Sequence, residues 1–336
     1  MIQYSQIPIP PRSEHLWRYT PWKRIHPTKI EEIPESDQIK FSEGIDYEMD
    51  GSNEISRSFL NSISKVCKKI VLNDESMELD LRCGGHICAG ELRIESSGDS
   101  ELVIRMSGDS GWTGLRICGE VNGRLSIALI NDLSIDGHLL RCEDWVVNRD
   151  STLEFATLST GGFLNKSDIR VRLDQNGAEV IGGIASNGHG SRHDDHHVEI
   201  DHSVGHTFSS LVMHASCDGS SHSIGTGLLT IRDGADGSDA GQVFRNLLLS
   251  EKARAEAIPE LEVLADDVKA AHGAASAPIN IEQLHYLNSR GFSQQEASSL
   301  IVEGFLMDAF RDIKNEKVTT ALRTRLLVHL ECLIKG

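Results

Sequence analysis

The chain has 336 residues, of which 39% are hydrophobic, so it can bury a substantial core. Its 50 acidic residues outnumber its 33 basic residues and give a formal net charge of −17. Because this charge repels phosphate backbones and anionic lipid, we expect no nucleic acid and no membrane surface as direct partners.

Features of membrane-bound and secreted proteins bear on the cellular compartment. No apolar run approaches the roughly 18 residues of a membrane span, and the first twenty residues lack a secretory signal pattern. The seven cysteines are odd in number and scattered, which favours reduced thiols over a disulfide framework. Only Cys83 and Cys88 lie close together, and they favour buried thiols over a metal site. We therefore expect a cytoplasmic protein.

Residues 1–69 are predicted to form an N-terminal arm with a short helical segment. Trp17 and Trp22 lie close together in this stretch, and we expect them to anchor the arm against the main body. Apolar residues recur every fourth position at Ile55 and Phe59 and again at residue 63, which indicates a helix.

Residues 70–275 predict a strand-rich body. Short alternating runs are broken by Gly, Asp, Asn and Ser, and no helical crossover intervenes. A sandwich, a barrel, a propeller and a β-helix all remain open. The irregular repeats favour a solenoid over a closed barrel, because each turn needs only to stack on its neighbour.

Residues 276–336 predict a C-terminal helical domain, joined to the body by the small-residue linker 273–278. Asn280 is a helix cap, and Gly291 is a natural residue to end that helix. Ser293 opens a capping box before the next helix. A last helix places four apolar residues at four-residue spacing: Val318, Leu322, Leu326 and Leu330.

The histidine-rich segment 189–206 is the most chemically suggestive cluster. His193, Asp195 and His197 would share one face of an extended strand, and their side chains are of the types that bind zinc or iron. No signature spacing accompanies them, and the glycine-rich flanks favour a polar, solvated surface turn. Its carboxylates also leave open a β-helical enzyme acting on carbohydrate.

The stretch NLLLSEKARAEAIPELEVLADDVKAAHGAASAPINIEQLHYLNSRGFSQQEASSLIVEGFL, residues 246–306, resembles the C-terminal part of the SufB/SufD family of iron–sulfur cluster assembly proteins. WRYTPWKRI, residues 17–25, is similar to the family's N-terminal arm. The resemblance implies a right-handed parallel β-helix, mainly β, with a short N-terminal segment and a C-terminal helical domain. It also implies that two family members pair through their β-helices, and that their helices dock an ABC-type ATPase, SufC.

Within that family the chain is SufD-like. Gly273 follows His272, where SufB-type chains carry a glutamate, and the cluster-building cysteine context of SufB-type chains is missing around Cys217. His272 matches the SufD histidine that faces the SufB site, so it is a candidate iron ligand or proton shuttle. The alternative is a structural histidine at the end of the β-helix. Ala270 stands where the family often has a cysteine.

The resemblance predicts a non-catalytic scaffold subunit that holds an iron–sulfur cluster only transiently, together with a SufB-type partner. Its expected ATPase-docking residues are Tyr286, Leu287, Arg290, Gly291, Phe305 and Met307. Leu287 and Phe305 could instead belong to the core of the helical domain. Two alternatives stay open: a SufD-like homodimer with its own metal or cluster site in segment 189–206, and a β-helical carbohydrate-active enzyme.

Overall fold

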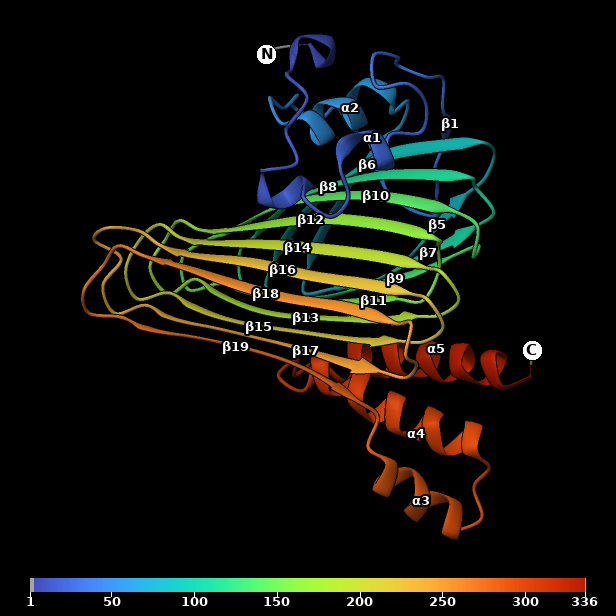
Figure 1. Cartoon of the computed structure of the whole chain (residues 1–336). Coiled ribbons are helices and arrows are strands. Elements are labelled where there is room, and N and C mark those ends of the chain that lie inside the picture. The colour runs from blue at the N-terminus through green and yellow to red at the C-terminus, as the bar shows by residue number, and fades with distance from the viewer. Residues whose placement is uncertain (1–2, 336) are drawn as a thin grey trace.

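The computed structural model describes residues 3–335 and is built on two long parallel sheets (Figure 1). Sheet A contains β4 (Cys67–Asn73), β6 (Ile87–Ser97), β8 (Trp112–Val121), β10 (His138–Val147), β12 (Leu164–Leu173), β14 (His193–His202), β16 (His222–Ile231) and β18 (Arg254–Val263). Sheet B contains β5 (Ser76–Cys83), β7 (Asp99–Gly108), β9 (Arg124–Leu133), β11 (Thr152–Ser159), β13 (Glu179–Gly188), β15 (Phe208–Cys217), β17 (Asp239–Leu248) and β19 (Lys269–Pro278). Three short strands complete the edges: β1 (Asp37–Gln38), β2 (Lys40–Phe41) and β3 (Ile45–Asp46).

Successive strands alternate between the two sheets, and each long strand pairs in parallel with the strand two places further along the chain. From β4 to β19 the described chain therefore winds through eight turns of two strands each. The predicted mainly-β parallel solenoid is confirmed.

The alternation of side chains along each strand determines which face packs inside. In β12, Ile169, Val171 and Leu173 are buried in the core between the sheets, whereas Arg170 and Arg172 point outward. Some turns demand glycine. Gly108 has φ +135°, and a Cβ there would collide with the carbonyl oxygen of Cys83 on the preceding turn.

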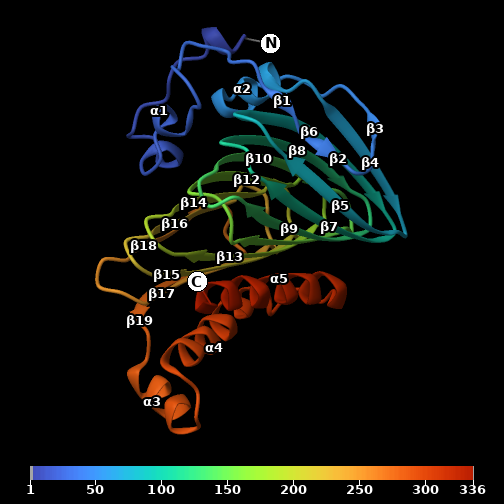
Figure 2. The same cartoon turned by 90° about the vertical axis from the view of Figure 1, so that its right-hand side faces the viewer.

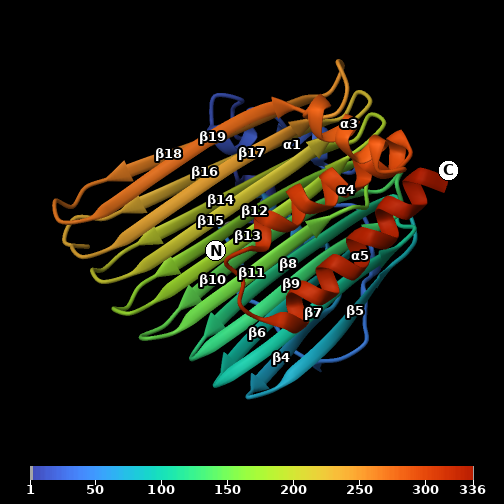
Figure 3. The same ribbon diagram turned by 90° about the horizontal axis from the view of Figure 1, so that it is seen from below.

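Two C-terminal helices cover the outer face of sheet B (Figure 3). They are α4 (Gln294–Met307) and α5 (Glu316–Lys335), and the shorter α3 (Ile281–Ser289) precedes them. Leu306, Phe310 and Leu322 pack against apolar sheet residues such as Ile130 and Leu158. The predicted caps at Asn280 and Ser293 are confirmed, and so is the buried stripe of the last helix.

The N-terminal segment covers the opposite side of the solenoid, on the outer face of sheet A (Figure 2). It contains α1 (Trp22–Ile25) and α2 (Ile55–Ile63). Trp17 and Trp22 are buried together with Phe59 of α2 and Trp112 of β8. The predicted aromatic anchor and the predicted helix are both confirmed.

The predicted linker 273–278 is wrong. These residues form the second half of β19, where Gly273 to Pro278 pair in register with residues 243–248 of β17. Alanine, glycine and serine favour strands weakly, but the neighbouring turn supplies a template that fixes their conformation. No helix within residues 3–335 is long and apolar enough to cross a membrane.

Candidate functional site

The histidine-rich segment is the buried strand β14, not a solvated turn, so the predicted turn is wrong for residues 193–202. His193, His196, His197 and His202 are all buried. Each face of β14 is covered: one by the solenoid interior, the other by the N-terminal segment, which arrives from about 170 residues earlier in the chain. The glycine-rich flanks form the turns on either side.

His193, Asp195 and His197 do share the outward face of β14. Each has a different partner: Thr20 Oγ1 lies 2.9 Å from His193 Nε2, Lys166 Nζ lies 3.0 Å from Asp195 Oδ1, and Thr226 Oγ1 lies 2.7 Å from His197 Nδ1. None of these three contacts joins two of the three side chains to each other. Among the described residues, no group of three or more His, Cys, Asp or Glu side chains is arranged to hold a metal.

The inward face of β14 is a second polar row. Asp194 pairs with Arg192 at 2.6 Å and accepts a hydrogen bond from Asn165, and His196 hydrogen-bonds with Ser167 at 2.7 Å. Asp194 and Asp195 therefore point to opposite faces, and each is buried in an ion pair. Two carboxylates flanking one sugar bond must converge on a shared opening, and these two do not.

Burial keeps several of these histidines neutral. It lowers the pKa of His193, His196 and His202 to about 4 each, because an imidazolium loses its hydration inside the protein. His202 hydrogen-bonds through both ring nitrogens, with Thr207 at 2.7 Å and Ser209 at 2.8 Å. These rings act at neutral pH as hydrogen-bonding groups.

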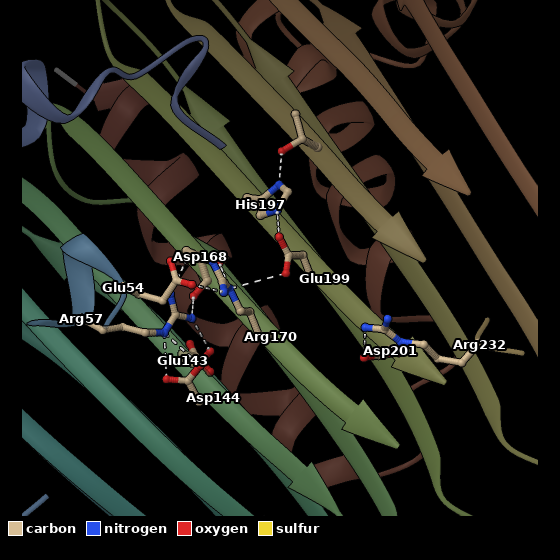
Figure 4. A network of polar contacts seen from close by, with 11 residues as sticks. Glu54, Arg57, Glu143, Asp144, Asp168, Arg170, His197, Glu199, Asp201 and Arg232 are labelled. Carbon is tan, nitrogen blue, oxygen red and sulfur yellow. Dashed lines mark hydrogen bonds and ion pairs between the residues drawn. The ribbon is translucent and has the colours of Figure 1, made fainter. Parts of the chain in front are cut away.

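A charged network on the outer face of sheet A joins α2 to the strands (Figure 4). The buried guanidinium of Arg57 pairs with Asp168 at 2.5 Å and with Asp144 at 2.8 Å. Arg170 continues the network from Asp168 to Glu199. Sequence reasoning missed Arg57, because an arginine on an amphipathic helix ordinarily faces solvent.

His272 lies on the last turn of the solenoid. It is in register with Gln242 of β17, which is buried and points inward, so His272 faces the same interior side. His272 is nevertheless exposed, because no further turn stacks on β19.

The end of the solenoid is open. No residue of β18 or β19 is buried, whereas most residues of β12 and β14 are. Lys269 donates its backbone N–H group to Ser238, just before β17, and Ile279 donates to Leu248 of β17. By alternation, the N–H groups of residues 270, 272, 274 and 276 point to the open edge. Proline, which has no N–H to offer, occupies outward positions at Pro278 of β19 and, by the same alternation, at Pro259 of β18.

Of the six residues predicted to dock an ATPase, three line one groove and three do not. Tyr286, Leu287 and Phe305 line an open groove of about 820 Å³ between α3, α4 and the ends of β17 and β19. Tyr286 is 58% exposed, and the guanidinium of Arg290 lies 5.1 Å from its ring centroid. Gly291 ends α3 with φ +98°, and it does not line this groove.

Met307 and Phe305 also face the body. Met307 is partly buried against the core shared by the helices and sheet B. The Phe305 ring stacks on His214 with centroids 4.7 Å apart, and its carbonyl oxygen lies 2.7 Å from His214 Nδ1. Phe305 therefore both lines the groove and fixes α4 to the solenoid.

Two of the buried thiols, Cys142 and Cys217, are poor nucleophiles. Burial raises the pKa of Cys217 to about 12 and that of Cys142 to about 11, so both stay protonated at neutral pH. Cys83 and Cys88 are buried beside each other at the start of the solenoid, as expected for structural thiols.

The fold and these sites define a parallel β-solenoid with an open final turn and appended helices. Residues 102–305, more than half of the chain, match the family model described as "SUF system FeS cluster assembly, SufBD core domain". The chain belongs to this SufBD family of iron–sulfur cluster assembly proteins.

Relatives support the same assignment at lower coverage. The chain is 28% identical over 259 residues to an iron–sulfur cluster assembly SufBD family protein of Mycobacterium leprae, covering 74% of this chain and 64% of that protein. It is 38% identical over 112 residues to SufD of Bacillus subtilis, covering 33% of this chain and 26% of that protein. The match to SufD of Escherichia coli is 34% over 100 residues, covering 30% and 24%. The chain thus spans just under two thirds of the M. leprae relative it matches.

Proposed function

We propose that this chain is a SufD-like, non-catalytic subunit of a cytoplasmic iron–sulfur cluster assembly complex, which pairs with a SufB-type paralogue and docks a SufC-type ATPase. The observation that carries the proposal is the open last turn. An exposed strand edge is a template for another strand, and solenoids need a cap or a partner at each end. A second solenoid stacked on β18 and β19 would bury both exposed strands.

His272 stands where such a partner would meet the chain. Its exposed imidazole on the inward side of β19 could bind iron or pass a proton to a sulfide, in a cluster completed by partner residues. The cluster is cargo in this proposal. A variant with His272→Ala should pair normally and lose cluster formation.

The ATPase would dock at the groove that Tyr286, Leu287 and Phe305 line. No residue of α3 is buried, so this helix makes little contact with the body of its own chain and offers its surface to a partner. Figure 2 shows α3 projecting away from the solenoid.

Co-expression with a SufB-type paralogue and a SufC-type ATPase from the same source tests the assignment, with light scattering to give the mass of what co-purifies. A ternary complex supports it. A homodimer that binds neither partner contradicts it and favours the alternative in which two copies of this chain pair. The same open edge permits such pairing.

A substitution on the open edge sharpens this test. Ala274→Pro removes a backbone N–H that points to the open edge and that no strand within residues 3–335 uses. We therefore expect partner affinity to fall about tenfold or more while the chain stays folded. Ala274→Ser keeps the N–H and serves as the matched control. Equal pairing by the proline variant, measured by titration with the SufB-type partner, would place the interface elsewhere.

A further inference from the structure

Three consecutive turns of the solenoid place equivalent residues in a ladder at one end of sheet A. The first residues of β14, β16 and β18 are His193, His222 and Arg254, which are in register on the outer face. Two residues before each strand, Ser191, Ser220 and the corresponding residue of the third turn, Lys252, form a second row. Strand spacing puts successive members of the first row about 4.8 Å apart.

The ladder lines a cavity of about 570 Å³ whose opposite wall is Arg24 of α1. Arg24, Lys252 and Arg254 are exposed, and within residues 3–335 none of them forms an ion pair. The one acidic side chain in the lining is Glu251. Of the nearby carboxylates, Asp195 pairs with Lys166 through Oδ1 and also attracts Arg24 electrostatically, and Glu256 lies 3.3 Å from His222. Three unpaired cations thus converge in a chain with an overall charge of −17.

His193 lines the cavity and has one ring nitrogen without a hydrogen-bond partner in the described part of the chain. Arg24 Nη1 lies 3.5 Å and Thr20 Oγ1 2.9 Å from His193 Nε2. A guanidinium can only donate, so Nε2 accepts, and the proton of the neutral ring is on Nδ1. This Nδ1–H has no partner among the described residues.

We propose that this cavity is an anion site that binds a phosphate group, either inorganic phosphate or the phosphate monoester of a small molecule. Two arginines and a lysine supply charge, and the His193 N–H and the hydroxyls of Ser191 and Ser220 supply further donors. No aromatic side chain other than the two imidazoles lines the cavity, so nothing there stacks a nucleobase. A local cluster of cations attracts an anion even when the whole molecule is negative.

A bound phosphate would join the N-terminal segment to the solenoid. Arg24 belongs to the segment that covers sheet A, whereas Lys252 and Arg254 belong to the turn before β18 and to β18 itself. The ligand would bridge these two parts of the chain. Binding is independent of the proposed role in cluster assembly.

Calorimetric titration of the full chain with inorganic phosphate, and separately with glycerol 2-phosphate, tests the site at constant ionic strength. We expect saturable binding of at least one of them; tighter binding of glycerol 2-phosphate identifies a monoester, and equal or weaker binding identifies free phosphate. Arg254→Gln and Lys252→Gln should each weaken binding about tenfold, since each removes a charge-assisted contact.

Lys23→Gln is the matched control, because Lys23 is exposed on the same short helix as Arg24 and does not line the cavity. It should change affinity less than twofold. The proposal is overturned if neither probe binds saturably, or if Lys23→Gln weakens binding as much as the two cavity variants. Lys252 lies in an exposed turn, so its variant keeps the test valid even if Arg254→Gln folds poorly.

Discussion

Arg57 is a charged residue whose side chain is only 2% exposed. Its guanidinium keeps the pKa of the equally buried Asp168 well below the usual range, although burial alone would raise it. Arg57→Ala would leave that carboxylate with Arg170 as its remaining cation, so we expect the free energy of unfolding to fall by about 3–5 kcal/mol in urea denaturation.

The control for this prediction lies on the same sheet. Arg232 pairs with Asp201 at 2.8 Å, but its side chain is 55% exposed (Figure 4). Arg232→Ala should lower the free energy of unfolding far less than Arg57→Ala, because water screens an exposed pair. Equal losses for the two variants would show that burial does not set the strength of the Arg57 pairs.

The buried histidines predict a particular acid sensitivity. Above pH 6.5 a ring such as His202 is neutral in both the folded and the unfolded chain, so stability is complete. Below that pH the imidazole binds a proton in the unfolded chain, whereas in the folded chain it stays neutral down to about pH 4. The free energy of unfolding should therefore fall between pH 6.5 and about 4, by about 1.4 kcal/mol per pH unit for each such histidine.

Urea midpoints measured between pH 7 and pH 4.5 test this, with His202→Asn as the variant. This variant should lower the dependence of the unfolding free energy on pH by about 1.4 kcal/mol per pH unit, and His285→Asn, at an exposed position of α3, serves as the control substitution. An unchanged slope for His202→Asn would mean that His202 takes up its proton before the chain unfolds.

The limits of sequence reasoning are clearest at the same residues. Alternation correctly placed His193, Asp195 and His197 on one face, because the geometry of a strand is local. Their burial depends on a segment about 170 residues away, which no local pattern reveals. Composition therefore suggested a solvated turn where the fold makes a buried strand.

At the scale of elements, α3 is a C-terminal helix without a single buried residue. Tyr286→Ala should lower affinity for a SufC-type ATPase about tenfold, because exposed aromatic side chains dominate such interfaces, and should leave the melting temperature unchanged. Surface-immobilised ATPase gives the measurement. His285→Ala, one residue away and also exposed, is the control; equal losses would point to a general change in α3 instead of a Tyr286 contact.

Element boundaries were predictable where a single residue fixes them and unpredictable where a neighbour does. The caps at Asn280 and Ser293 satisfy backbone donors by themselves, so the sequence is enough to place the helix starts. Residues 273–278 have no strong preference of their own and become a strand only because β17 lies beside them. The docking residues Gly291 and Met307 came from family resemblance, and the structure places neither in the groove.

For the whole molecule, α4 and α5 share one core with sheet B. Leu322 is fully buried there, so Leu322→Ala should cost about 2–5 kcal/mol. Because this core is common to both parts, the helical and strand signals in circular dichroism should melt together at the lowered temperature. Loss of helix signal well before strand signal would show two independently folding parts.

The N-terminal segment touches the chain far from its own place in the sequence. Lys166 donates to the carbonyl of Leu16 at 2.7 Å, and His15 pairs with Glu260 at 2.7 Å. During synthesis the contact with Lys166 cannot form before β12 has left the ribosome, and the contact with Glu260 must wait for β18, in the last turn. Trp17 and Trp22 emerge before Trp112 and Leu164, the sheet residues that help to bury them, so the nascent chain has a need for chaperone protection that the finished protein does not.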